Sequence, residues 1–303
     1  MNTLVHKAFP LAAVIAPALL AMVASMSAGQ EDKPPELRKV AVGDGVELHY
    51  VERGKGVAVL FVHGTLGDYS TWDGQLGPFA ETYRAIAYSR RYNYPNTNKL
   101  RPKHSAVVEA EDLAALIKKL DLGKVHIVGH SYGAYTALFL AVKHADMVRT
   151  LTLAEPPLVF AEERVEEAKA QLVKRARAAF EKGESEDAIR TIVNSSREGT
   201  YDKIPEPFRK RLQRNAQELE ALVTSDNMYP GLGRDAVRKI AVPVLLLSGE
   251  KSPPSHKLID EELERLLPEK VRQRVIIRDA DHGMWFQQPE ACRKAALEFL
   301  RGK

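Results

Sequence analysis

The sequence holds a single cysteine, Cys292, and this scarcity excludes an internal disulfide. Stability must therefore come from a core, which 303 residues with 45% hydrophobic content can supply as one α/β domain with an insertion. The net charge is only +4, and no basic stripe with interleaved aromatics occurs, so nucleic acid is not an expected partner. Neither a glycine-rich phosphate loop nor metal-ligand spacing is present. We therefore expect no metal and no cofactor.

Long apolar runs are also scarce, and the one that stands apart extends from Pro10 to Val23. Lys7 precedes it, small residues follow it, and a charged, proline-containing stretch comes next at 30–35, which is the layout of a secretory signal peptide. The run is short for a membrane span and Pro17 interrupts it, so cleavage is favoured over a retained anchor. We expect residues 1–28 to be a signal peptide and the mature protein to be periplasmic or secreted, without a stable membrane anchor.

Apolar runs alternate with helical patterns along the rest of the chain. Residues 38–53 predict a two-stranded ribbon around Gly43-Asp44-Gly45. The run at 57–62 is almost wholly apolar, which is typical of a parallel strand covered on both faces. Further strand patterns lie at 84–88, 124–128, 148–154, 242–247 and 271–277. Because helical stretches such as 107–120 separate them, the pattern predicts an α/β class with a doubly wound, mostly parallel sheet.

One long region lacks any strand pattern. Between about Pro157 and Lys239 the sequence is rich in Ala, Glu, Arg and Leu, with helical periodicity over 162–182, 186–194 and 207–223. We predict a helical cap at 157–239, inserted into a core made of 38–156 and 240–303. Inserted blocks of this kind commonly close an active site, whereas the alternative is a solvated helical excursion.

The stretch Gly129-His130-Ser131-Tyr132-Gly133 lies between an apolar strand and an alanine-rich helix. A sharp turn from strand to helix strains the residue at its apex, and small flanking residues let neighbouring chain pass. The spacing therefore predicts an exposed serine nucleophile, and a glycine-flanked serine in an ordinary turn is the alternative.

Together with Val62-His63-Gly64-Thr65 and Ala280-Asp281-His282-Gly283, this stretch resembles the α/β-hydrolase superfamily over residues 38–303. The resemblance implies a backbone oxyanion hole formed by the N–H groups of Thr65, or less favourably Leu66, and Tyr132. Backbone donors suit this role because they are fixed before charge develops. The side chain of His63 is expected to point into its own loop.

The same resemblance assigns the general base. Serine needs a base to take its proton, and His282 follows the last predicted strand and precedes the C-terminal helix, as the family base does. His126 lies within a strand and His130 within the turn, where neither is expected to face Ser131.

The acid that orients the catalytic histidine departs from the common pattern of the family. Most relatives place the acid two residues beyond a Gly-Glu or Gly-Asp after the seventh strand, where this chain has Ser252. A minority place it at the end of the sixth strand, where Glu155 stands. An acidic residue that ends an apolar strand is costly to bury without a function, so Glu155 is favoured. The alternatives are Glu250, Asp279 and Asp281.

Residues 88–96 follow the fourth strand, near the expected pocket. Arg90 and Tyr92 could bind a polar group of the substrate or could instead brace the loop, and Trp285 could line the pocket or belong to the core. The resemblance implies a serine hydrolase for a small ester or lactone, with an acyl-serine intermediate. A C–C bond hydrolase, a cofactor-free perhydrolase and a weakly catalytic ligand-binding protein are the alternatives. The oligomeric state stays open.

Overall fold

A computed structural model describes residues 35–157, 163–195 and 199–303 of the chain. The expected signal peptide, residues 1–28, lies outside these described residues. Among the helices that are described, none combines the length and apolar character needed to cross a membrane.

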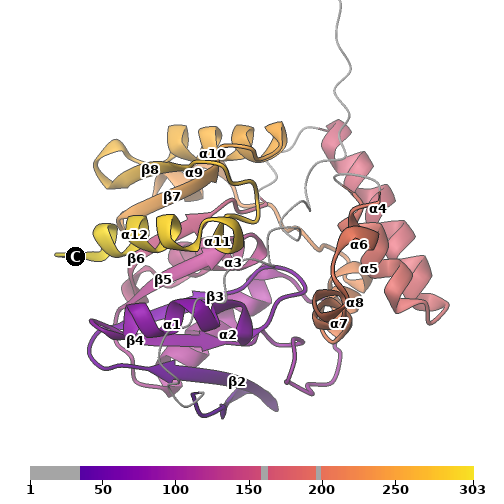
Figure 1. Ribbon diagram of the computed structural model, residues 1–303, viewed down its shortest axis with the longest axis horizontal. Helices are drawn as coiled ribbons and strands as arrows, with labels where there is room; N and C mark the ends of the chain where they lie inside the picture. The colour runs from indigo at the N-terminus through magenta and orange to yellow at the C-terminus, as the bar shows by residue number, and fades with distance from the viewer. Residues whose placement is uncertain (1–34, 158–162, 196–198) are drawn as a thin grey trace, which may run out of the picture.

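Eight strands form one sheet in the order β1-β2-β4-β3-β5-β6-β7-β8 (Figure 1). The first two form the expected antiparallel ribbon, and β2 is also antiparallel to β4. All the other neighbours are parallel, so the predicted fold class is confirmed. The strands are β1 (Arg38–Gly43), β2 (Val46–Arg53), β3 (Ala58–Val62), β4 (Arg84–Tyr88), β5 (Val125–His130), β6 (Val148–Ala154), β7 (Val244–Gly249) and β8 (Arg272–Ile277).

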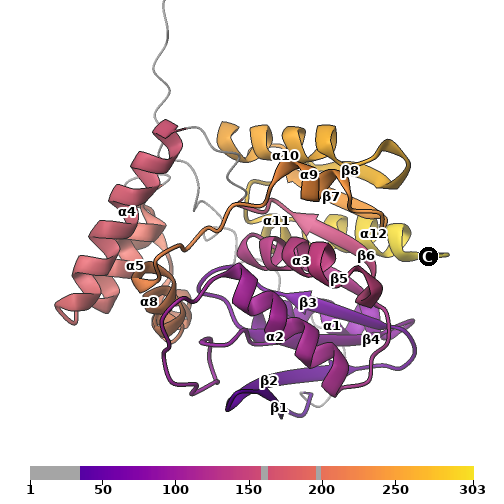
Figure 2. The ribbon, with the colours of Figure 1, turned by 180° about the vertical axis from the view of Figure 1, so that it is seen from behind.

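The core lies in two layers, one on each face of the sheet, and β3 shows why its sequence is wholly apolar. Ala58, Leu60 and Val62 join one buried cluster, whereas Val59 and Phe61 join the other. Successive side chains of a strand point to opposite faces, so both sets are buried. Helices α1 (Asp73–Ala80) and α12 (Pro289–Leu300) cover one face (Figure 1). Helices α2 (Ala106–Lys119), α3 (Tyr132–Lys143) and α10 (Pro254–Leu266) cover the other (Figure 2).

Between β6 and β7 the described residues contain helices and no strand. Helices α4 (Glu163–Glu181), α5 (Ser185–Val193), α6 (Thr200–Lys203), α7 (Glu206–Gln213) and α8 (Ala216–Thr224) lie together at one side of the sheet (Figure 1). The short α9 (Arg234–Arg238) packs instead against α3 and α10. We call α4–α8 the helical block.

The single helix expected over 207–223 is two helices, α7 and α8, and Asn215 separates them. Its amide oxygen accepts a hydrogen bond from the Tyr94 N–H at 2.8 Å, and its amide nitrogen donates to Asp68 Oδ2 at 3.0 Å. The buried Asn215 side chain at this break therefore contacts the loops that follow β3 and β4.

Candidate active site

Ser131 occupies the sharp turn between β5 and α3. Its backbone has φ 52° and ψ −122°, a conformation that a non-glycine residue adopts only under strain. The flanking glycines are required by close approach. A Cβ at Gly133 would lie 2.2 Å from the Val62 carbonyl oxygen, and one at Gly129 would lie 2.7 Å from Cα of Ala134. The structure therefore builds the turn that the motif predicted, with Ser131 at its apex.

Glu155 directly follows β6 and meets His282 from the loop after β8. Glu155 Oε2 lies 2.7 Å from His282 Nδ1, and Oε1 accepts the Gly249 N–H at 2.8 Å. Glu155 is 1% exposed and His282 is 5% exposed. Because a carboxylate can only accept, Nδ1 carries the proton and Nε2 is left with a lone pair. Burial lowers the pKa of His282 to about 4, so the ring is neutral at pH 7.

The strands β5 and β6 place Ser131 beside Glu155. His130 pairs with Ala154 in the parallel register, and the Ser131 N–H donates to the Ala154 carbonyl at 2.8 Å. Ser131 and Glu155 are therefore the residues that leave two neighbouring strands at the same level of the sheet.

The other acidic candidates are occupied away from His282. Glu250 is exposed, and its Oε2 accepts the Asp279 N–H at 2.9 Å. The Asp279 carboxylate pairs with Lys251 at 2.8 Å. Asp281 accepts from the Gly283 N–H and the Gln287 side chain, each at 2.8 Å. Among these carboxylates only Glu155 touches the His282 ring.

The loop after β3, residues 63–67, approaches Ser131 closely. A Cβ at Gly64 would lie 3.1 Å from Cβ of Ser131. The Leu66 N–H donates to Glu218 Oε2 at 2.7 Å, so it is unavailable to a substrate oxyanion. Tyr132 is the first residue of α3, and Ser131 makes no side-chain cap there. The Tyr132 N–H is a candidate donor, because early helix N–H groups lack partners within the helix. The Thr65 N–H, in the loop that approaches Ser131, is the other candidate.

His63 points into its own loop, as expected. Its Nδ1 donates to the Gly64 carbonyl at 2.9 Å, and its Nε2 accepts the Arg90 N–H at 3.0 Å. This tautomer follows because a carbonyl can only accept and an N–H can only donate.

Comparison with known proteins identifies the family. Residues 59–295 match the sequence model described as "Alpha/beta hydrolase family". The chain belongs to the alpha/beta hydrolase family. A 2-(acetamidomethylene)succinate hydrolase of Mesorhizobium japonicum is 27% identical over 274 residues, which cover 87% of this chain and 94% of that protein.

Solved structures share the fold of this alpha/beta hydrolase. An esterase from Thermogutta terrifontis is 23% identical, with a TM-score of 0.68, and the match covers 88% of this chain and 98% of that one. An enol-lactonase from Burkholderia xenovorans LB400 is 20% identical, with a TM-score of 0.66, and the match covers 86% and 98%.

Two further histidines of this alpha/beta hydrolase surround His282, and sequence reasoning did not place either of them there. The His130 ring centroid lies 4.8 Å from that of His282, and His130 Nε2 donates to the His282 carbonyl at 2.8 Å. Burial lowers the pKa of His130 to about 3, which keeps it neutral. His256 on α10 lies 4.4 Å from His282 between ring centroids. Helical spacing could have placed His256 inside, since Asp260, Leu263 and Leu266 share its buried face.

One group in the described part of the chain could hold a metal ion. Glu155, His256 and His282 are all buried, and their ligand atoms lie within 4.8 Å of one another. Two of the three, Glu155 and His282, are the pair already joined through Nδ1, so this group overlaps the candidate active site.

The residues considered for substrate contact, Arg90, Tyr92 and Trp285, are buried and have partners within the protein. Arg90 is 1% exposed and its guanidinium pairs with Glu109 and Glu218, so it braces the loops. The Tyr92 hydroxyl accepts the Arg101 N–H at 3.1 Å, and its ring packs on His104. Trp285 is 4% exposed and its ring centroid lies 5.2 Å from that of Trp72 within the core. These contacts are those of a loop brace for Arg90 and Tyr92 and of a core residue for Trp285.

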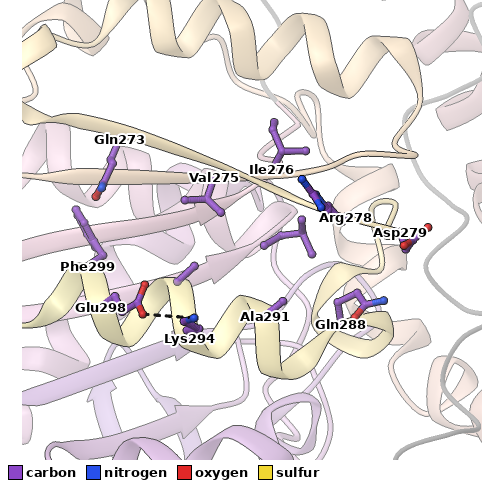
Figure 3. Close-up of a pocket in the computed structure, with 12 residues that line it drawn as sticks. Gln273, Val275, Ile276, Arg278, Asp279, Gln288, Ala291, Lys294, Glu298 and Phe299 are labelled. Atoms are coloured by element: carbon purple, nitrogen blue, oxygen red, sulfur yellow. Dashed lines mark ion pairs between the residues drawn. The ribbon is translucent and has the colours of Figure 1, made fainter.

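A groove of about 520 Å³ lies elsewhere, between β8 and α12 (Figure 3). Val275, Ile276, Ala291 and Phe299 are among its lining residues, and Ser131, Glu155 and His282 are not. The groove is therefore separate from the candidate active site.

Proposed function

We propose that the chain is a serine hydrolase that cleaves a small ester or lactone through an acyl-serine intermediate. Ser131 is the nucleophile, His282 the general base and Glu155 the acid that orients it. The observation that carries the proposal is the 2.7 Å contact between Glu155 and His282 Nδ1, made beside a strained serine turn. Names of similar proteins support the class, since they include an esterase and an enol-lactonase.

The chemistry follows from the protonation states. As Ser131 Oγ forms a bond to the substrate carbonyl carbon, its proton passes to His282 Nε2. Imidazolium charge then develops next to the Glu155 carboxylate, which stabilises it. The carbonyl oxygen becomes an oxyanion that the N–H groups of Thr65 and Tyr132 bind. When the tetrahedral intermediate collapses, the C–O bond to the alkoxy group breaks and His282 gives that group its proton.

The second half of the reaction repeats these roles. Water attacks the acyl-serine and loses a proton to His282, and collapse returns Ser131 and releases the acid. For a lactone, the hydroxyl formed in the first half remains part of the acyl chain, so hydrolysis of the acyl-serine releases a single hydroxy acid.

Labelling by a fluorophosphonate probe tests the proposal without knowledge of the substrate. We expect rapid labelling at Ser131, none in Ser131→Ala, and a fall of about 10²–10⁴-fold in rate for Glu155→Gln, because the amide cannot stabilise the imidazolium. Glu250→Gln is the matched control, since Glu250 is exposed and hydrogen-bonds the Asp279 N–H instead of His282.

Each outcome has a distinct meaning. Labelling unaffected by Glu155→Gln but slowed by Glu250→Gln would move the acid to Glu250. An unlabelled wild-type chain would contradict the enzyme assignment and favour a hydrolase-like binding protein.

A further inference from the structure

Glu218 lies on α8 of the helical block, yet its carboxylate reaches the loop beside Ser131. Oε2 accepts the Leu66 N–H at 2.7 Å, and Oε1 pairs with Arg90 Nη2. The side chain is fully buried. A carboxylate is rarely buried without partners, and here both oxygens are engaged.

Leu66 needs such a partner because its backbone is strained. Its φ is 59°, in the left-handed region that a residue with a Cβ avoids. A charge-assisted hydrogen bond from a carboxylate is among the stronger bonds that could hold this conformation. The strained peptide directly follows Thr65, whose N–H is a candidate oxyanion donor.

Arg90 holds the other side of the same loop. Its Nη2 donates to the Gly64 carbonyl at 3.1 Å, and its backbone N–H donates to His63 Nε2 at 3.0 Å. Glu218 therefore fixes Leu66 directly and Gly64 through Arg90, and these two residues flank Thr65.

We infer that Glu218 is a positioning residue that holds the Thr65 N–H in the geometry of the oxyanion hole. This inference rests on the proposed function, since it assumes an oxyanion at that place. The helical block thereby contributes to transition-state stabilisation through the 63–67 loop, without a residue that touches the reacting atoms.

Glu218 could also act only by holding the helical block against the loop after β3. This role can be separated from positioning of Thr65, because a separate ion pair joins the block to the same loop. Arg214 Nη2 pairs with Asp68 Oδ2 at 2.6 Å and donates to Ser70 Oγ at 3.0 Å, whereas the Leu66 N–H donates to Glu218. Arg214→Gln therefore weakens docking and leaves the Leu66 bond in place, which makes it the matched control. Glu218→Gln keeps the side-chain volume but offers one acceptor oxygen in place of two, so either Leu66 or Arg90 loses its acceptor.

The experiment measures the second-order rate of fluorophosphonate labelling and the hydrolysis of 4-nitrophenyl acetate by the full chain. The phosphonyl oxygen of the tetrahedral adduct occupies the oxyanion hole, so labelling reports the position of the hole. We expect Glu218→Gln to slow labelling and kcat about 10–100-fold with KM changed less than about threefold. We expect Arg214→Gln to stay within about threefold of wild type in labelling.

Equal rates for Glu218→Gln and wild type, or equal slowing by both variants, would overturn the inference while Ser131 remains the labelled nucleophile. An unlabelled wild type would overturn the proposed function and this inference together. If Glu218→Gln does not fold, Glu218→Asp replaces it, since the aspartate keeps a charge opposite Arg90 but withdraws it from Leu66. The same slowing is expected, and an unchanged rate would overturn the inference.

Discussion

Lowering the pH tests whether burial controls the basicity of His282. Burial lowers its pKa from 6.5 to about 4, which corresponds to roughly 3 kcal/mol of penalty on the imidazolium. Only the neutral ring can accept the Ser131 proton, so the rate is retained above the pKa of the folded protein and is lost as the pH falls through it. At pH 5 we expect roughly nine-tenths of the plateau rate, whereas an unperturbed histidine would leave about 3%.

The assay is the second-order rate of fluorophosphonate labelling between pH 4.5 and 8. Circular dichroism at each pH restricts the comparison to folded protein, and labelling of Ser131→Ala gives the background. A midpoint at pH 6.5 or above would refute the reasoning, because it would mean that the Glu155 carboxylate stabilises the imidazolium at least as much as burial disfavours it.

Two further predictions concern packing and stability. Gly133→Ala should destabilise the fold by about 1–3 kcal/mol or more and slow labelling, since its Cβ would lie 2.2 Å from the Val62 carbonyl oxygen. A Cβ at Gly77 would meet nothing within 4 Å, so Gly77→Ala should not destabilise the fold and is the control. Denaturant unfolding of both variants checks this prediction. Burial lowers the pKa of His126 to about 4, so the unfolded chain takes up its proton first as the pH falls. From pH 7 to 5 the stability of wild type relative to His126→Gln should fall by about 2 kcal/mol, and a pH-independent difference would contradict this.

The fold followed from local patterns because each apolar run is explained by one arrangement. Strands such as β3 are apolar at every position, which requires cover on both faces, and the helical stretches between them supply that cover. The Ser131 turn was predictable for the same reason, since a side chain at either flanking glycine would clash with backbone a few residues away or in the adjacent strand. Glu155 was favoured because a strand end rarely buries an acid.

Long-range pairing explains what the sequence left open. The sequence offers Arg90 as a substrate ligand because residues 88–96 follow the fourth strand near the expected pocket, but Glu218, which pairs with Arg90, is 128 residues away along the chain. Glu218 lies on a helix of mixed charge, a pattern that usually indicates solvent exposure. Its position one turn before the buried Leu222 is the signal that would have placed it inside.

The register between β5 and β6 has a mechanical consequence. Ser131 and Glu155 follow adjacent strands at matched positions. The distance between their backbones is therefore set by the spacing of hydrogen-bonded strands, roughly 4.8 Å. His282 instead lies well inside a loop, the segment between β8 and α11 (Met284–Gln287). Heat should therefore disorganise the catalytic group at this one loop before the sheet melts, so loss of activity should precede loss of ellipticity.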